Sequence, residues 1–300
     1  MRYVQLNQPY YYNELLNDAT LLKIAYPEFI QTENIGTTLS NSSIFMMRIG
    51  KGEKAILLTG GVHGRESINP VVLMAMAQYY ANAYKEKEEP LVVQKKYPVN
   101  LKEFFEEYSL YMIPLVNPDG YMVSLRGFNI IHNEELRLKA KSLGIPYKEW
   151  KYNVNSVDIN RNFPSKSWVK KNLFDEAGSE LETKAVMKVM QEIPFEAYID
   201  YHSRGKEIYY YRNTLSKTYN ARQLEIAYKL AEVSGYSLVN PKEEIEAGDS
   251  GGNTVHFFSE QFKKPAFTIE TVPELAQFPL RLTYQTQTFF EILYTPFFCV

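Results

Sequence analysis

Two residues of types that bind zinc stand three positions apart, His63 and Glu66. They follow the apolar run Leu57-Leu58 and the pair Gly60-Gly61, so the segment is expected to pass from a strand through a turn into a helix. Residues three apart on one helical turn face the same point. A catalytic zinc takes three protein ligands and a water. Because such a pair also occurs as a plain surface hydrogen bond, a metal site requires a third ligand from elsewhere.

The third ligand is expected at the end of another strand, and His202 is the best-placed histidine. It directly follows the strand-like run Ala197–Tyr201. The chain has four histidines, and the two others, His132 and His256, end no convincing strand, so we expect both in loops. With the first pair, His202 completes a set of two histidines and one glutamate, which is the ligand set of thermolysin-like and carboxypeptidase-like zinc sites. The set predicts one zinc ion per chain.

Glu270 is the candidate catalytic base. It follows the apolar run Ala266–Ile269 near the end of an expected strand. Apolar surroundings raise the pKa of a carboxyl group, which suits a general base that works near neutral pH. The same position would also suit a glutamate that points into water beyond a strand edge. The zinc motif favours the catalytic interpretation.

Asn160 and Arg161 are candidate substrate-binding residues. They lie in the segment Asp158–Pro164, where an amide and a guanidinium stand side by side. A guanidinium binds a carboxylate through two parallel hydrogen bonds, and an asparagine adds another. An Asn-Arg pair in a loop is also commonly structural. If the pair binds the substrate, the substrate carries a free carboxylate.

The elements expected around these residues alternate between strands and helices. Short apolar runs favour strands, and apolar residues at helical spacing favour helices. We expect strands over residues 44–49, 55–58, 108–115, 197–201 and 265–270. We expect helices over residues 11–25, 70–84, 180–192, 220–234 and 284–293. The alternation predicts an α/β fold with a mainly parallel or mixed sheet, at whose carboxyl edge ligands gather.

Two local signals mark where elements begin and end. Asn69 precedes Pro70 and is expected to be the N-cap of the helix that follows. Asn117-Pro118-Asp119-Gly120 is a turn signature at the end of the expected strand over residues 108–115. The run over residues 55–58 is wholly apolar, as in a strand buried on both faces.

Composition places the chain among ordinary globular proteins. It has 300 residues, 45% apolar and 23% charged, with a net charge of −2 and no linker-like stretch, so we expect one domain over residues 1–300. No basic excess is present to bind nucleic acid, and no apolar stretch is long enough to cross a membrane. The N-terminal residues do not resemble a signal peptide, and Cys299 is the one cysteine, so we expect a cytoplasmic protein.

Six motifs in order resemble those of the zinc carboxypeptidase family, from about residue 30 to the end of the chain. One such motif would be weak, whereas six in the family's order are specific. They are His63-Gly64-Arg65-Glu66, Asn117-Pro118-Asp119-Gly120, Asp158-Ile159-Asn160-Arg161-Asn162-Phe163, Asp200-Tyr201-His202-Ser203, Ser250-Gly251-Gly252 and Phe267-Thr268-Ile269-Glu270.

The resemblance implies a single α/β domain with a central mixed sheet of about eight strands flanked by helices. It also implies one zinc ion, with Glu270 helping to deprotonate the water that attacks the scissile carbonyl. The zinc would stabilise the oxyanion, and the protonated glutamate would then serve the leaving amine. Asn160 and Arg161 would anchor the carboxylate of the residue on the leaving side.

The segment Trp150-Lys151-Tyr152-Asn153 resembles the bacterial branch of that family. This branch includes γ-D-glutamyl-diamino acid endopeptidases, which cut cell-wall stem peptides between D-glutamate and the diamino acid. The implied partner is a peptide or muropeptide with a free carboxylate. The alternatives are a general metallocarboxypeptidase, a zinc-dependent deacylase or amidase of a small amide, and a non-catalytic binding protein. The sequence leaves open the cleavage position, the side-chain preference and the oligomeric state.

Three positions depart from the family pattern. Ala247 stands where digestive members carry a tyrosine, and Asn155 stands where bacterial members usually carry an arginine. The arginine expected to polarise the carbonyl is therefore unassigned, with Arg126 and Arg137 as candidates. Thr254, at a position that often sets specificity, is neutral and predicts no charge preference. We expect the loops over residues 94–104 and 132–148 to shape the cleft.

Overall fold

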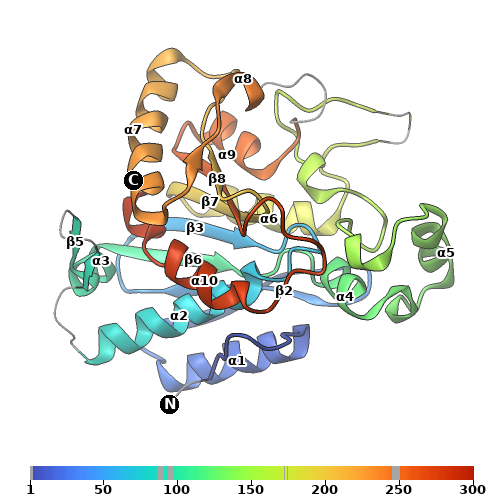
Figure 1. The fold of residues 1–300 in the computed structure, drawn as a ribbon, viewed down its shortest axis with the longest axis horizontal. Coiled ribbons are helices and arrows are strands. Elements are labelled where there is room, and N and C mark those ends of the chain that lie inside the picture. The colour runs from blue at the N-terminus through green and yellow to red at the C-terminus, as the bar shows by residue number, and fades with distance from the viewer. Residues whose placement is uncertain (1–2, 87–90, 94–96, 172, 174, 245–250) are drawn as a thin grey trace.

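Eight strands form the central sheet of the computed structural model, which describes residues 3–86, 91–93, 97–171, 173, 175–244 and 251–300 (Figure 1). In chain order these strands are β1 (Ile30–Thr37), β2 (Ser43–Ile49), β3 (Lys54–Gly60), β6 (Tyr108–Ile113), β7 (Phe195–Ser203), β8 (Glu207–Tyr209), β9 (Ser237–Leu238) and β10 (Ala266–Thr271). Their spatial order is β1-β2-β6-β3-β7-β10-β8-β9. A separate hairpin joins β4 (Leu91–Val93) and β5 (Tyr97–Val99).

The four middle strands, β6, β3, β7 and β10, run parallel to one another. At one edge β2 pairs antiparallel with β6 and β1 antiparallel with β2. At the other edge β8 pairs antiparallel with β10, and β9 lies parallel to β8. The expected mixed sheet of about eight strands is therefore confirmed. Its parallel centre directs the carboxyl ends of four strands to one edge.

Helices cover both faces of the sheet. They are α1 (Tyr12–Ala25), α2 (Asn69–Glu86), α3 (Leu101–Glu107), α4 (Pro118–Arg126), α5 (Glu134–Ser142), α6 (Leu181–Glu192), α7 (Lys217–Ser234), α8 (Pro241–Glu244), α9 (Thr254–Phe262) and α10 (Tyr284–Ile292). In Figure 1, α1 and α2 lie below the sheet and α9 lies above it. Among the described residues no helix is long and apolar enough to span a membrane.

β3 shows why the sheet has a core on each face. Ile56 and Leu58 pack into one apolar cluster, together with residues of α1, α2, α7 and α10. Ala55 and Leu57 point to the opposite face, into a second cluster that includes residues of α6 and α9. Because successive strand residues face opposite sides, a strand buried on both faces must be apolar throughout. The expectation for residues 55–58 is thus confirmed.

Most expected elements are found with small shifts at their ends. The five expected helices correspond to α1, α2, α6, α7 and α10, and the five expected strands to β2, β3, β6, β7 and β10. The strand expected over residues 108–115 already ends at Ile113. The strands of the central sheet that were not expected, β1, β8 and β9, lie toward its edges, and the unexpected β4 and β5 form the separate hairpin.

The N-cap prediction for Asn69 is wrong. Asn69 is the first residue of α2, and its side chain points toward the sheet. Its amide donates to the backbone oxygen of Tyr201 and to Ser203 Oγ, and its Oδ1 accepts from Thr271 Oγ1. The fully buried Asn69 side chain therefore ties the start of α2 to the ends of β7 and β10.

The turn expected at Asn117-Pro118-Asp119-Gly120 is instead the first turn of α4. Asn117 is the N-cap, since its side chain accepts from the backbone N–H of Gly120, 2.9 Å away. Pro118 occupies the first helical position, where its missing N–H costs nothing. The same residue types serve turns and helix starts, and here the chain continues as a helix.

We expect Leu57→Ala to destabilise the protein far more than the same change at Leu138. Leu57 is fully buried in β3, whereas Leu138 on α5 is 58% exposed. Removing a buried leucine side chain costs about 2–5 kcal/mol, and an exposed one about 0.5 kcal/mol or less. Urea unfolding of both variants measures the difference. Equal losses would contradict the assignment of β3 to the centre of the core.

Candidate active site

The predicted metal ligands and the predicted base meet at the carboxyl edge of the parallel strands. His63 and Glu66 follow β3, His202 lies near the end of β7, and Glu270 lies near the end of β10. The expectation that His63 and Glu66 share a helical turn is wrong, because both lie in the irregular turn between β3 and α2. The backbone N–H of Glu66 donates to the carbonyl oxygen of His63 at 3.2 Å, which closes that turn.

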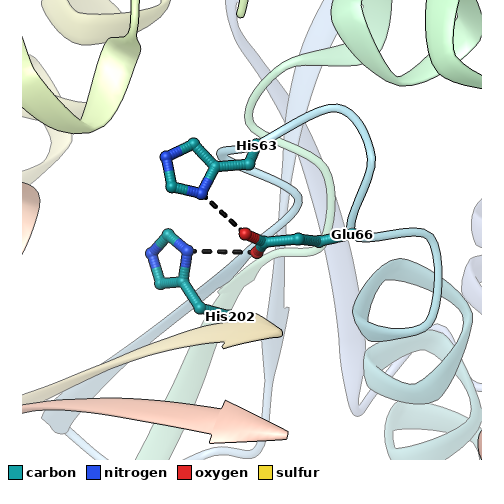
Figure 2. A group of neighbouring side chains, drawn as sticks. All are labelled: His63, Glu66 and His202. Carbon is teal, nitrogen blue, oxygen red and sulfur yellow. Dashed lines mark hydrogen bonds and ion pairs between the residues drawn. The ribbon is translucent and has the colours of Figure 1, made fainter. Parts of the chain in front are cut away.

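The Glu66 carboxylate lies between two imidazole rings (Figure 2). Its Oε1 is 2.6 Å from His63 Nδ1, and its Oε2 is 3.1 Å from His202 Nδ1. One ligand atom from each residue lies within 4.8 Å of the other two. Glu66 Oε2 is buried and has no hydrogen bond, despite the nearby imidazole. A buried oxygen left without a hydrogen bond, beside two imidazole nitrogens, fits a zinc ion, so the cluster can bind this metal.

Each imidazole also contacts a carboxylate on its far side. His63 Nε2 lies 3.3 Å from Asp158 Oδ1, and His202 Nε2 lies 2.9 Å from Asp200 Oδ2. A carboxylate at Nε2 favours the tautomer with its proton there, which leaves the Nδ1 lone pair for a metal. Both histidines thus present the same nitrogen to the common centre.

Asp200 is itself fixed by hydrogen bonds. Thr59 Oγ1 donates to its Oδ1 at 2.6 Å, and Thr254 Oγ1 donates to its Oδ2 at 2.5 Å. The carboxylate is fully buried and can stay charged because these donors and His202 surround it. Although burial opposes ionisation, the charge of His202 and these hydrogen bonds lower the pKa of Asp200 below its usual range.

Asp158 has an equivalent set of partners. Lys151 Nζ lies 2.6 Å from its Oδ2, and the backbone N–H of Asn160 donates to its Oδ1 at 3.0 Å. Although burial opposes ionisation, His63 and Lys151 lower the pKa of Asp158 well below its usual range. Conversely, the carboxylates Glu66 and Asp158 raise the pKa of His63 against the effect of its burial.

Glu270 stands beside His202 in the sheet. The two residues are paired in register between the parallel strands β10 and β7, so their side chains leave the sheet on the same side. Burial raises the pKa of Glu270 from 4.5 to about 8, against the lowering effect of His202. A carboxyl group tuned to neutral pH beside a metal cluster is able to accept and return a proton.

A pocket of about 470 Å³ opens onto this edge of the sheet. Its walls include His63, Glu66 and Glu270. The basic residues that line it are Arg65, Lys151 and Arg204. A substrate in this pocket would lie beside His63, Glu66 and the candidate base together.

Asn160 and Arg161 lie near the cluster but do not line the pocket. Both belong to the short 3-10 helix Ile159–Arg161, directly after Asp158. Asn160 is 8% exposed, and its Oδ1 accepts from the backbone N–H of Thr254 at 3.3 Å. Arg161 Nη1 donates to the carbonyl oxygen of Asn160 at 2.8 Å. Their role in binding substrate stays a prediction.

The other two histidines belong neither to the candidate metal cluster nor to the lining of the pocket. His132 is exposed in the loop before α5, as expected. His256 was expected in a loop, but it is buried in α9, where its Nδ1 lies 3.1 Å from Ser167 Oγ. The prediction of a loop was wrong because it considered only whether an apolar strand precedes the histidine. A buried histidine inside a helix has no such strand before it.

Neither of the candidate carbonyl-polarising arginines, Arg126 and Arg137, is among the residues that line the pocket. Arg126 lies over the ring of Tyr11, at 4.0 Å from its centroid. Arg137 lies 3.9 Å from Glu134 on α5. No described residue in the ranges 94–104 and 132–148 lines the pocket either, so the expectation that these loops shape it is wrong for the described part.

Ala247, one of the positions that depart from the family pattern, lies outside the described residues. The same holds for Ser250, the first residue of the Ser250-Gly251-Gly252 motif. Thr254 is fully buried, and its hydroxyl is engaged by Asp200, so it has a structural reason to be small and polar. Asn155 donates to Glu180 Oε2 at 3.2 Å and has no contact with the metal cluster.

Sequence reasoning did not assign roles to Asp200, Asp158, Arg65 and Arg204. A signal existed for Asp200, since residues two apart on a strand share a face and Asp200 precedes His202 by two. Asp158 and Arg65 stood inside recognised motifs, but nothing in their spacing shows which atoms they contact. Arg204 follows His202, and only the folded chain brings it into the pocket.

Comparison with known proteins agrees with this arrangement. The curated relatives include γ-D-glutamyl-L-diamino acid endopeptidase 1 of Lysinibacillus sphaericus, 26% identical over 284 residues, which cover 90% of this chain and 67% of that protein. Mouse carboxypeptidase A4 is 24% identical over 82% of this chain and 58% of its own length. The chain thus spans about half to two thirds of the length of such relatives.

Solved structures share the fold. Bovine thrombin-activatable fibrinolysis inhibitor superposes with a TM-score of 0.74 at 20% identity, over 98% of this chain and 95% of that chain. The murein-tripeptide amidase MpaA from Escherichia coli O157 superposes with a TM-score of 0.52 at 17% identity, over 87% and 89%. The sequence pattern of the zinc carboxypeptidase family matches residues 16–285, and the chain belongs to this family of zinc peptidases.

Proposed function

We propose that this protein is a zinc metallopeptidase that hydrolyses the amide between γ-D-glutamate and a diamino acid in bacterial cell-wall stem peptides. The similarity to γ-D-glutamyl-L-diamino acid endopeptidase 1, which extends over 90% of the chain, carries the choice of substrate. The clustering of His63, Glu66 and His202, and the pocket that His63, Glu66 and Glu270 line, support the type of reaction.

His63, Glu66 and His202 are proposed to hold one zinc ion. Zinc bound there supplies a Lewis acid, which polarises a carbonyl and lowers the pKa of water. Asp158 and Asp200 fix the two rings, so that both Nδ1 atoms point to the same place. The protein thereby orients the ligands before the metal binds.

Glu270 is proposed to move the proton. Its carboxylate takes a proton from the attacking water and returns it to the leaving nitrogen, so it acts first as a base and then as an acid. The raised pKa supports this role, because a carboxyl group with its usual pKa would be a poor proton donor near neutral pH. The neighbouring strand positions of Glu270 and His202 keep the base beside the metal ligands.

Asn160 and Arg161 are proposed to bind the carboxylate of the leaving residue. The segment is anchored beside the metal cluster, because Asp158 contacts His63 and accepts from the backbone of Asn160. The guanidinium and the amide are suitable donors for a carboxylate. When the diamino acid is the last residue of the stem peptide, it is the leaving residue and carries a free carboxylate.

Zinc content tests the ligand assignment. We expect about one zinc per chain in the wild type and a large loss in His202→Ala, because a catalytic zinc requires its three protein ligands. His132→Ala is the matched control, since His132 is an exposed loop residue, and should keep its zinc. Elemental analysis after dialysis gives the ratio. Equal zinc contents in the two variants would contradict the proposed site.

Hydrolysis by Glu270→Gln tests the base. This variant should bind zinc normally but lose about 10²–10⁴-fold in kcat, because glutamine accepts no proton. Glu135→Gln, a change on the exposed surface of α5, should behave as wild type. The substrates are a γ-D-glutamyl-diaminopimelate peptide and a simple peptide with a free C-terminal residue.

The substrate that the wild type cleaves decides among the alternatives. Cleavage of the γ-D-glutamyl bond supports the proposal. Cleavage of the simple peptide alone would identify a general metallocarboxypeptidase. Zinc binding without hydrolysis of either peptide would favour a deacylase, an amidase of a small amide, or a non-catalytic binding protein.

The pH dependence of kcat/KM gives an independent readout of Glu270. Burial raises its pKa to about 8, and the charge of a bound zinc would lower it again. Because the base must be ionised, kcat/KM should fall about tenfold per pH unit on the acid side of a midpoint between 4.5 and about 8. The measurement follows kcat/KM at constant zinc content. If the fall of kcat/KM at low pH were unchanged in Glu270→Gln, the titrating group would be another residue.

A further inference from the structure

Two arginines are carried by the same turns as the metal ligands. Arg65 stands between His63 and Glu66 in the turn after β3, and Arg204 follows His202 by two positions at the end of β7. Both line the pocket whose walls include His63 and Glu66. The backbone segments that fix the ligands therefore also fix the positions of these two cations relative to the reacting bond.

Both guanidinium groups lie against the same aromatic ring. The Cζ atom of Arg65 is 4.6 Å from the centroid of Phe278, and that of Arg204 is 5.8 Å from it. A cation over an aromatic face is stabilised by the ring, which limits its motion. Phe278 lines the same pocket, so both cations contact one residue of its wall.

Neither guanidinium is neutralised within the described part of the chain. The Nε atoms of Arg65 and Arg204 are buried and have no hydrogen-bond partner. Neither group forms a salt bridge with a described carboxylate, although Glu149 and Glu274 line the same pocket. Lys151 differs, since it is paired with Asp158. Two guanidiniums that line one pocket without a described anionic partner are suited to bind an anion.

The other charges in the pocket indicate which anion fits. Besides Glu66 of the metal cluster, three glutamates line it, Glu149, Glu270 and Glu274, and they would repel a dianion such as a phosphate. A carboxylate carries a single charge, and its planar pair of oxygens matches the guanidinium fork. The expected ligand is therefore a carboxylate of the substrate.

We propose that Arg65 and Arg204 together bind a carboxylate on the acyl side of the scissile bond. This inference rests on the proposed function and defines its specificity. A γ-linked glutamate keeps its α-carboxylate free, a short methylene chain away from the carbonyl that is attacked. An ordinary α-peptide has no main-chain carboxylate on that side. Asn160 and Arg161, proposed for the leaving-side carboxylate, do not line this pocket, so the two carboxylates have separate sites.

Hydrolysis of matched substrates tests the proposal. One substrate is the γ-D-glutamyl-diaminopimelate peptide, and the second replaces D-glutamate with 4-aminobutyrate, which lacks only the α-carboxylate on the acyl side. Arg204→Gln and Arg65→Gln should each lower kcat/KM for the first peptide about 10- to 100-fold, the value of a hydrogen bond to a charged group. For the second peptide, the same two variants should change kcat/KM less than about threefold.

Two further variants separate binding from folding. Arg204→Lys keeps the charge but loses the two-pronged geometry, so it should recover only part of the loss. Arg137→Gln removes an arginine that does not line the pocket and should change neither substrate. An equal loss on both substrates in Arg204→Gln would overturn the proposal in favour of a structural role. A loss that disappears when the leaving residue is amidated would overturn it in favour of the leaving-side carboxylate.

A binding measurement keeps the inference separate from the proposed function. The probes are N-acetyl-D-glutamate, the acyl-side product, and 4-acetamidobutyrate, which lacks the α-carboxylate. Calorimetric titration of the zinc-loaded wild type should show about tenfold tighter binding of the first, and Arg204→Gln should abolish this difference. Such binding without hydrolysis of the γ-glutamyl peptide would disprove the substrate but support the arginine site. Hydrolysis with no preference between the probes would support the substrate and overturn the arginine site.

Discussion

The burial of the Glu66 carboxylate between the Nδ1 atoms of His63 and His202 is the constraint on which the rest of the site depends. A charge buried this deeply is tolerated only beside opposite charge, so the turn after β3 and the end of β7 must be neighbours. The parallel pairing of β3 with β7 makes them neighbours, and apolar residues on both faces of β3 fix that strand in the core. The hydrophobic core thus sets the position of a polar cluster at its edge.

The charges of this cluster explain how it can exist and still bind a metal. Glu66, Asp158 and Asp200 contribute three negative charges, while the carboxylates raise the pKa of His63 and of His202. Two protonated rings give −3 + 2 = −1, and two neutral rings with one Zn²⁺ also give −3 + 2 = −1. Exchange of two protons for the metal therefore leaves the net charge of the cluster unchanged. The surrounding fold need not rearrange to compensate, and metal binding must weaken as the pH falls.

Residues at the ends of apolar strands were predictable, and residues defined by loop geometry were not. His202 and Glu270 were found because each ends a recognisable apolar run, and the parallel pairing of β7 with β10 then placed them together. His63 and Glu66 were also found, although in a turn and not in a helix. β1 was missed because its sequence, IQTENIGT, has no apolar alternation, and its pairing with β2 comes from the rest of the sheet. The role of Arg204 depends on Phe278, a distant residue in sequence, so no local pattern could show it.

The two kinds of group in the pocket differ in how their charge is balanced. Around the candidate metal ligands, the carboxylates of Glu66, Asp158 and Asp200 each have a cationic or hydrogen-bonding partner, which fixes their geometry before substrate arrives. Beside Phe278, the buried Nε atoms of Arg65 and Arg204 have no hydrogen-bond partner, which is why we propose them as ligands for a carboxylate. Because Arg65 lies between the proposed metal ligands His63 and Glu66 in one turn, the backbone of that turn would set its distance from the reacting carbonyl. A rigid spacing of this kind distinguishes substrates by the position of their carboxylate along the chain, not merely by their charge.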